Sequence, residues 1–241
     1  MLIFIVGDIW NCYNVGMKKK IRHIFGGKCM NKKERKLTSA EQKRKVDFEN
    51  TFKEMEQKGY LKKDLSFSVL YANIMGVIIM LPFVVIAFVV YFFVNPRSRW
   101  SFSLFSFTGI IFLIALLLLF LLHEIIHGLT WGLFTKGHWS AISFGIIWKL
   151  LTPYCTCAEP LKKTQYIVGA VMPTLILGFG LTGIATNWGN FTLFVLSLCM
   201  IFGGSGDFLI ILKLLRYRCQ NKTVLIYDHP YECGFIIFEK T

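Results

Sequence analysis

The chain has 241 residues, of which 54% are hydrophobic, and it carries a formal net charge of +13. This hydrophobic share is too high for one soluble domain of this length, and it predicts a membrane protein. The charge does not indicate a nucleic-acid partner, because 16 of the 27 Lys and Arg residues lie between Lys18 and Lys63, ahead of the first long apolar stretch. A cytoplasmic flank carries its basic residues in this way.

The N-terminal part of the chain contains one predicted basic amphipathic helix. Residues Thr38 to Gln42 resemble a capping box, and Phe48, Phe52 and Met55 follow at helical spacing before Gly59 ends the pattern. Such a helix either lies on anionic lipid or docks on the membrane core. A solvated helix beside the membrane fits the pattern equally well.

The first residues and the cysteines bear on targeting. The apolar run at Met1–Val6 is shorter than the core of a signal peptide, so no cleaved signal is expected. Met17 and Met30 each open a Lys-rich stretch, which leaves the translation start open between Met1 and these two positions. The seven cysteines are odd in number and lack the pattern of a disulfide scaffold, so reduced thiols are expected.

Four apolar stretches are each about as long as the roughly 20 residues that cross a bilayer. They predict four transmembrane helices at Leu70–Val94, Leu104–Leu133, Ile167–Ala185 and Phe191–Leu212. With the N-terminus inside, the Lys-rich loops and the basic tail also fall inside, in agreement with the positive-inside rule. The sequence therefore predicts a multi-pass protein of the cell membrane with cytoplasmic N- and C-termini.

Short β-like runs lie outside these stretches. Ser140–Trp148 is too short to span a bilayer and predicts a re-entrant segment or a hairpin after the second helix. Thr223–Tyr227 and Gly234–Phe238 predict a small cytoplasmic hairpin. The expected fold class is thus an all-α membrane protein with these two additions. Its expected parts are a basic N-terminal segment (1–66), a transmembrane core (67–215) and a tail hairpin (216–241).

The sequence His123-Glu124-Ile125-Ile126-His127 lies inside the second predicted span. Residues four apart on a helix are separated by about 40° around the axis and roughly 6 Å along it, so both imidazoles reach one ion. Glu124 then lies beside the metal and can take a proton from its bound water, as in zinc metallopeptidases. Ionised groups in mid-membrane cost roughly 2.5–3.5 kcal/mol, and zinc binding, at about 10 kcal/mol or more, offsets this. The alternative is that these groups pair with one another or face a polar cavity.

A catalytic zinc ion requires a third protein ligand. Asp207 is the only acidic residue besides Glu124 in a predicted span, and both lie in the same leaflet. The preceding Gly203-Gly204-Ser205-Gly206 has little side-chain bulk, which allows close helix approach. Asp207 is therefore the candidate third ligand. The alternative is a hydrogen bond from Asp207 to a neighbouring helix without metal.

The zinc motif in a membrane helix, Pro173 in the next span and Gly206-Asp207 in a later one resemble the site-2 class of intramembrane metalloproteases. The chain more closely resembles a bacterial domain-of-unknown-function family described as zincin peptidases, over roughly Leu70–Phe238 and including Pro153-Tyr154-Cys155. The resemblance implies His123, His127 and Asp207 as zinc ligands and Glu124 as the general base. In site-2 proteases the aspartate stands in an Asn-Pro-Asp-Gly or Leu-Asp-Gly context, whereas here it stands in Ser205-Gly206-Asp207-Phe208.

Other side chains are weaker candidates. Cys155-x-Cys157 suits a metal or redox pair but is more typical of plain residues. His138 is expected to be solvated at the interface. Asp228-His229 suits an alternative ligand, a substrate-orienting pair or a simple turn, and Pro173 is expected to kink its helix, with or without a role in admitting substrate or water.

Together these features predict a zinc-dependent membrane metalloprotease that cleaves membrane-associated protein or peptide substrates at the cytoplasmic side. Its expected partners are the lipid bilayer and that substrate, with no nucleic acid and with the oligomeric state left open. The main alternative is a non-proteolytic membrane protein with a structural or metal-handling zinc site, marked by a fourth ligand such as His229 or a cysteine. A transporter and a lipid-binding scaffold are further alternatives.

Overall fold

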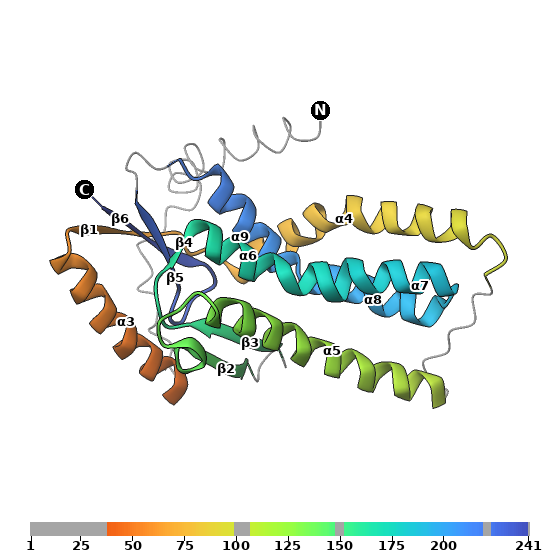
Figure 1. Cartoon of the computed structure of the whole chain (residues 1–241), viewed down its shortest axis with the longest axis horizontal. Helices are drawn as coiled ribbons and strands as arrows, with labels where there is room; N and C mark the ends of the chain where they lie inside the picture. The colour runs from red at the N-terminus through yellow and green to blue at the C-terminus, as the bar shows by residue number, and fades with distance from the viewer. Residues whose placement is uncertain (1–37, 99–106, 148–151, 219–222, 241) are drawn as a thin grey trace, which may run out of the picture. The chain divides into compact units, whose positions relative to one another are not determined.

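The computed structural model describes residues 38–98, 107–147, 152–218 and 223–240 (Figure 1). The predictions that no signal peptide is cleaved and that translation starts at Met1, Met17 or Met30 concern residues outside these ranges, as does the part of the basic flank before residue 38. The described chain is mostly helical and carries two small antiparallel sheets.

Apolar helices make up most of the molecule. Three of them, at Leu70–Val94, Thr108–Gly132 and Lys163–Trp188, are long and apolar enough to cross a membrane, and a bent helix pair makes a possible fourth span. The elements are α4 (Val69–Val94), α5 (Phe107–Gly132), α6 (Lys163–Pro173), the π-helix η3 (Thr174–Gly180), α7 (Leu181–Trp188), α8 (Phe191–Gly203) and α9 (Ser205–Arg216). The four predicted apolar stretches therefore correspond to helices. Residues 104–106 of the second stretch lie outside the described ranges.

The third and fourth predicted stretches are less regular than a plain helix. Beyond Pro173 the backbone continues as the π-helix η3 and returns to α-geometry in α7, so a local change of helix type lies where a kink was predicted. The fourth stretch breaks at Gly204, and its halves α8 and α9 meet at 41°. The fourth predicted span, Phe191–Leu212, corresponds to this bent pair, which breaks because the Gly-Gly-Ser-Gly sequence has low helix propensity.

The fold is not all-α, because two sheets lie at one end of the helices (Figure 1). The predicted segment after α5 is a hairpin of β2 (Ile142–Ile147) and β3 (Thr152–Cys157), preceded by the short 3-10 helix η2 (His138–Ala141). The tail forms a hairpin of β5 (Val224–Asp228) and β6 (Phe235–Lys240), as predicted.

The tail hairpin is part of a larger sheet that the sequence did not indicate. It pairs on one side with β1 (Tyr60–Asp64) and on the other with the short β4 (Leu161–Lys162), in the order β1-β6-β5-β4. All four strands are antiparallel to their neighbours. The larger sheet therefore joins the segment before α4 to the tail. The division of the chain at residues 66 and 215 remains a prediction.

Helix α3 (Ser39–Gln57) packs its apolar side on this sheet rather than on lipid. Phe48 and Met55 are buried in a cluster with Tyr227, Ile236 and Phe238 of the two tail strands. Within its bounds the helix contains four basic and five acidic residues, so it is not a basic helix. The interpretation as a helix lying on anionic lipid was wrong for its apolar face, because the sheet already covers that face.

A buried cluster joins both sheets to the helices that carry the candidate site. Its members come from α5, α6, α9 and strands of both sheets, and they are Trp131, Ile142, Cys157, Leu161, Tyr166, Ala170, Ile211, Leu214, Ile226, Phe235 and Ile237. A second cluster joins α4, α7 and α8, where the rings of Tyr91 and Phe194 stack at 4.1 Å. The first cluster sets the position of the sheets relative to the C-terminal ends of α5 and α9.

Candidate metal centre

Helix α5 places both motif histidines on its inner face. His123 and His127 lie one helical turn apart and are only 4% and 3% exposed, while Leu122 and Ile125 face outward. The inner face is covered by α6 and by the β2–β3 hairpin, where Gly128 packs against Phe144. An added side chain at Gly128 would overlap this ring, so the glycine allows the hairpin to approach the helix next to the motif.

The break between α8 and α9 brings in Asp207. Gly203 packs against Phe120 of α5, and Gly204 packs so closely against Thr174 that a Cβ atom would lie 1.8 Å from the Thr174 hydroxyl oxygen. These contacts fix the start of α9, and Asp207 stands in its first turn. The small residues before Asp207 therefore allow the close helix approach that the sequence predicted.

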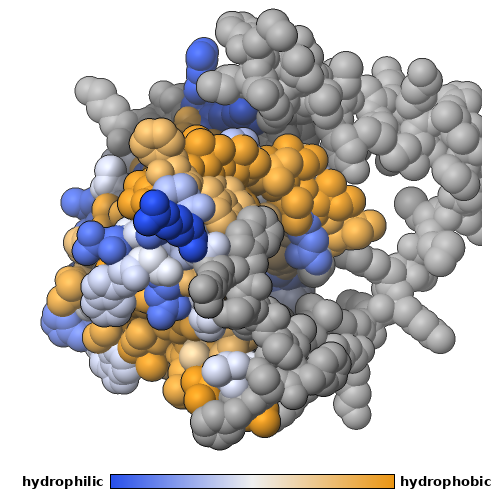
Figure 2. Space-filling view, turned by 90° about the vertical axis from the view of Figure 1, so that its right-hand side faces the viewer, coloured by the Kyte–Doolittle hydropathy of each residue, from blue (hydrophilic) through white to orange (hydrophobic). Residues whose placement is uncertain are grey.

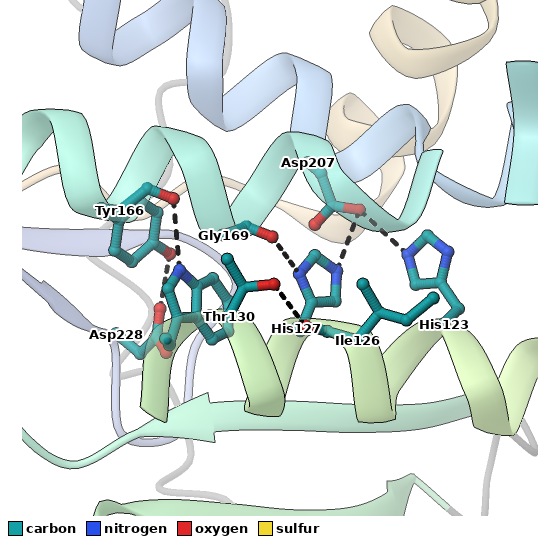
Figure 3. A network of polar contacts seen from close by, with 9 residues as sticks. His123, Ile126, His127, Thr130, Tyr166, Gly169, Asp207 and Asp228 are labelled. Atoms are coloured by element: carbon teal, nitrogen blue, oxygen red, sulfur yellow. Dashed lines mark hydrogen bonds and ion pairs between the residues drawn. The ribbon is translucent and has the colours of Figure 1, made fainter. Parts of the chain in front are cut away.

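The three candidate ligands converge. Oδ2 of Asp207 lies 3.3 Å from Nε2 of His123 and 3.4 Å from Nε2 of His127 (Figure 3). Among the described residues these three form a group whose ligand atoms all lie within 4.8 Å of one another. In a tetrahedral site with zinc–ligand distances near 2.0–2.1 Å, neighbouring ligand atoms are separated by roughly 3.3 Å. The two His–Asp distances match that value.

The hydrogen bonding of His127 also fits a cation. Its Nδ1 lies 2.9 Å from the carbonyl oxygen of Gly169 and donates to it, so in the neutral ring Nε2 carries a lone pair. That lone pair faces the carboxylate of Asp207, and two acceptors at this distance need a proton or a metal cation between them. A backbone carbonyl that accepts the other ring N–H of a ligating histidine, and so fixes its tautomer, is typical of metal sites. The set of two imidazoles and one carboxylate is of the kind that binds zinc.

Glu124 lies beside this group without joining it. It is half-buried on the turn that carries both histidines, and it is not one of the three clustered residues. Its carboxylate lies close to the backbone N–H of Cys155 in β3. A carboxylate next to the metal ligands is placed to exchange a proton with a group bound between them.

Comparison with known families bears on these residues. Residues 116–221, a little under half of the chain, match the model of a family described as "Putative zincin peptidase". This segment is similar to that family and is called the zincin segment below. The zincin segment contains His123, Glu124, His127 and Asp207, and it is shorter than the range of roughly Leu70–Phe238 that the sequence suggested. Comparisons with curated proteins and with solved structures found no match. The likeness to site-2 proteases remains a prediction.

A network behind His127, which the sequence did not reveal, supports the zincin segment (Figure 3). The ring of Trp131 stacks on that of His127 at 4.9 Å and on that of Tyr166 at 5.3 Å. The Tyr166 hydroxyl donates to Asp228 at the end of β5. The spacing of four between His127 and Trp131 places both on one helix face, but no sequence pattern links Tyr166 to Asp228.

The two cysteines of β3 do not take part in the ligand group. Cys157 is buried in the cluster that joins the sheets to the helices, and Cys155 packs against the same cluster. Burial raises the pKa of the Cys157 thiol to about 12 and raises the pKa of the Cys155 thiol well above its usual value. Such thiols are poor nucleophiles and poor ligands. The interpretation as a metal or redox pair has no support in this packing.

The remaining candidates also lie apart from the ligand group. Nδ1 of His138 lies 3.1 Å from the carbonyl oxygen of Gly132 at the end of α5. His229 is buried, and its Nε2 lies 3.5 Å from a carboxylate oxygen of Asp64. Burial raises the pKa of Asp228, although the hydrogen bond from Tyr166 acts in the opposite direction. Within the described ranges, none of these three residues belongs to the group of His123, His127 and Asp207.

Proposed function

We propose that the chain is a membrane-embedded zinc metallopeptidase that cleaves peptide bonds of membrane-associated proteins from the cytoplasmic side. The observation that carries this proposal is the convergence of His123, His127 and Asp207, from two separate helices, on a space small enough for one ion. The matched family is described as a zincin peptidase, which supports the same chemistry.

The residues around the ion have separate roles in this proposal. His123, His127 and Asp207 hold the zinc, which when bound polarises the scissile carbonyl and acidifies a water molecule. Glu124 accepts the proton of that water and passes it to the leaving amine. The Gly169 carbonyl holds His127 in the tautomer that leaves Nε2 free to bind metal.

The surface supports a position in the bilayer. Most of the large hydrophobic side chains of α4 and α5 face outward, among them Phe93, Leu117 and Leu118 at 86%, 65% and 61% exposed. In the view of Figure 2, hydrophobic residues form large areas of the described surface, with polar residues among them. His123 lies nine residues before the end of α5, and Asp207 lies nine residues before the end of α9. At 1.5 Å per residue, both lie at a depth of about 13 Å from the sheet end of the helices.

A substrate must be extended before it is cut, because helical backbone bonds shield its carbonyls. The edge of β3 that faces Glu124 is the surface we propose for the extended strand. Pro153 has no N–H, and the Cys157 N–H already donates to Asp228. The Cys155 N–H lies close to Glu124, so the backbone carbonyls of this edge are the groups left for pairing. The tail hairpin is a poorer candidate, since β5 and β6 each already have a partner strand on both sides.

The main alternative, a closed structural zinc site, requires a fourth protein ligand. Among the described residues the group has three members. The fourth ligand that the sequence suggested, His229, is instead paired with Asp64 in the turn of the tail hairpin. Three protein ligands with an adjacent carboxylate favour the hydrolytic arrangement over the structural one.

The test uses Glu124→Gln, which keeps the shape of the side chain and removes its basicity. Wild type, Glu124→Gln and a control, Glu56→Gln on the exposed side of α3, are produced in bacterial cells, and new protein N-termini are mapped by mass spectrometry. We expect new termini in membrane proteins with wild type and with the control, and none with Glu124→Gln, while all three purify with one zinc ion. Unchanged termini with Glu124→Gln would contradict the proposal, and so would a zinc-loaded wild type that produces no cleavage.

A further inference from the structure

The metal side of the site is supported by a stack of three rings. The His127 and Trp131 rings are nearly parallel, at 16°, and those of Trp131 and Tyr166 make 29°. The Trp131 indole N–H donates to the backbone carbonyl of Tyr166 at 3.2 Å. The stack fits because position 169 is a glycine, where a Cβ atom would lie 2.0 Å from the indole nitrogen. The position of the His127 ring therefore depends on where Trp131 and Tyr166 lie.

The last ring of this stack is held by a residue of the tail. The Tyr166 hydroxyl donates to Oδ1 of Asp228, and Tyr166 itself is only 3% exposed (Figure 3). Asp228 is the last residue of β5 and lies beyond the zincin segment, which ends at residue 221. The larger sheet, which contains β5, thus contacts the His127 side of the site through one buried side-chain hydrogen bond.

The other oxygen of the same carboxylate reaches the side of the general base. Oδ2 of Asp228 accepts the backbone N–H of Cys157 at 2.8 Å. Cys157 lies two residues along β3 from Cys155, whose N–H lies close to the Glu124 carboxylate. Both oxygens of Asp228 are therefore used, one toward the helix that backs His127 and one toward the strand beside Glu124.

From these contacts we propose that Asp228 is a positioning residue of the metal centre, which holds the His127 ring through Tyr166 and Trp131 and holds the strand beside Glu124 through Cys157. This inference rests on the proposed zinc site. It gives the larger sheet a role in positioning the residues of the site. The sheet order β1-β6-β5-β4 also ties the segment before α4 to the same carboxylate. A change that shifts the sheet relative to α6 would loosen both sides of the site together.

Two variants separate positioning from folding. Tyr166→Phe keeps the stacked ring and removes only the hydroxyl that donates to Asp228, and Asp228→Asn replaces one acceptor oxygen with an NH₂ group. The matched control is Tyr217→Phe, which removes a similar bond, at 2.7 Å from the Tyr217 hydroxyl to Glu239 in the same sheet. The Tyr217 ring does not stack on His127, Trp131 or Tyr166. Its hydrogen bond to Glu239 therefore contributes to stability but does not hold the His127 ring.

The measurements are zinc affinity, by competition with a fluorescent chelator, and the visible spectrum of the cobalt-substituted protein. Loss of a group that orients a metal ligand lowers metal affinity about 10- to 100-fold. We expect a fall of about tenfold for Tyr166→Phe and for Asp228→Asn with a changed cobalt spectrum, no further fall in the double variant, and wild-type values for Tyr217→Phe. Wild-type affinity and spectrum in Tyr166→Phe would overturn the inference, as would an equal loss in Tyr217→Phe. If wild type itself bound no zinc, the proposed function would fail first, and the inference would fail with it.

Discussion

Nε2 of His127 lies 3.4 Å from Oδ2 of Asp207, while Nδ1 of the same ring lies 2.9 Å from the carbonyl oxygen of Gly169. The imidazole is thus held between a backbone acceptor and a carboxylate. A ring that donates on one side presents a lone pair on the other, and a cation shared with Asp207 satisfies both. This arrangement links the backbone of α6 to the chemistry proposed for α5 and α9.

Gly169→Ala tests the packing behind that ring. The new methyl group would overlap the Trp131 indole, whose nitrogen lies 2.0 Å from the ideal Cβ position, so Trp131 must move away from His127. Overpacking of this kind costs about 1–3 kcal/mol. We expect a lower melting temperature and weaker zinc binding, measured by thermal unfolding and chelator competition. Gly183→Ala in α7 is the control, because its Cβ position has no neighbour within 4 Å. Equal effects of the two substitutions would contradict the explanation that the new methyl group displaces Trp131 from His127.

The thiols of β3 are expected to react slowly. Because burial raises the pKa of Cys157 to about 12, its thiolate fraction near pH 8 is on the order of a thousandfold lower than that of an unperturbed thiol with a pKa of about 8.5. Cys155 is shifted in the same direction by the same cause. Site-resolved alkylation with iodoacetamide, in native and in denatured protein, measures both. Rapid native labelling of either cysteine would show that it is accessible and ionised.

The turn of the tail hairpin is expected to weaken in mild acid. Burial lowers the pKa of His229, whose Nδ1 accepts the backbone N–H of Glu232 at 2.9 Å and whose neighbouring charges are Asp64, Glu232 and Lys62. Since the folded state binds this proton less readily than the unfolded state, the stabilisation is complete above a pH of about 6.5 and declines as the pH falls below that value.

The variant His229→Asn isolates this group, because it retains an acceptor and does not titrate. Between pH values of about 7 and 5, we expect the melting temperature of wild type to fall further than that of the variant. Parallel curves for the two proteins would mean that His229 is not responsible for the acid sensitivity.

Much of the site was predictable because its key features are local. The spacing of His123 and His127 places both on one helix face by geometry alone, and hydropathy located the apolar stretches. Asp207 was found by elimination among a few acidic residues. Its approach to α5 depends on the break at Gly204, which the sequence analysis interpreted only as a lack of side-chain bulk.

The features that escaped prediction depend on distant parts of the chain. The strand β1 joins the tail because Tyr60–Asp64 pairs with β6, and strand pairing between segments this far apart leaves no periodic signal. The apolar side of α3 was visible, but sequence does not distinguish a face that packs on a sheet from one that packs on lipid. The bond from Tyr166 to Asp228 joins α6 to β5, and neither residue stands in a motif.

Zinc stoichiometry tests directly whether His123, His127 and Asp207 hold one zinc ion. Purified wild type, His127→Ala, Asp207→Ala and the control Asp47→Ala on α3 are compared by metal analysis after dialysis against a mild chelator. We expect about one zinc ion per chain in wild type and in the control, and a small fraction of that in His127→Ala and Asp207→Ala. Full zinc occupancy in Asp207→Ala, or none in wild type, would contradict this expectation.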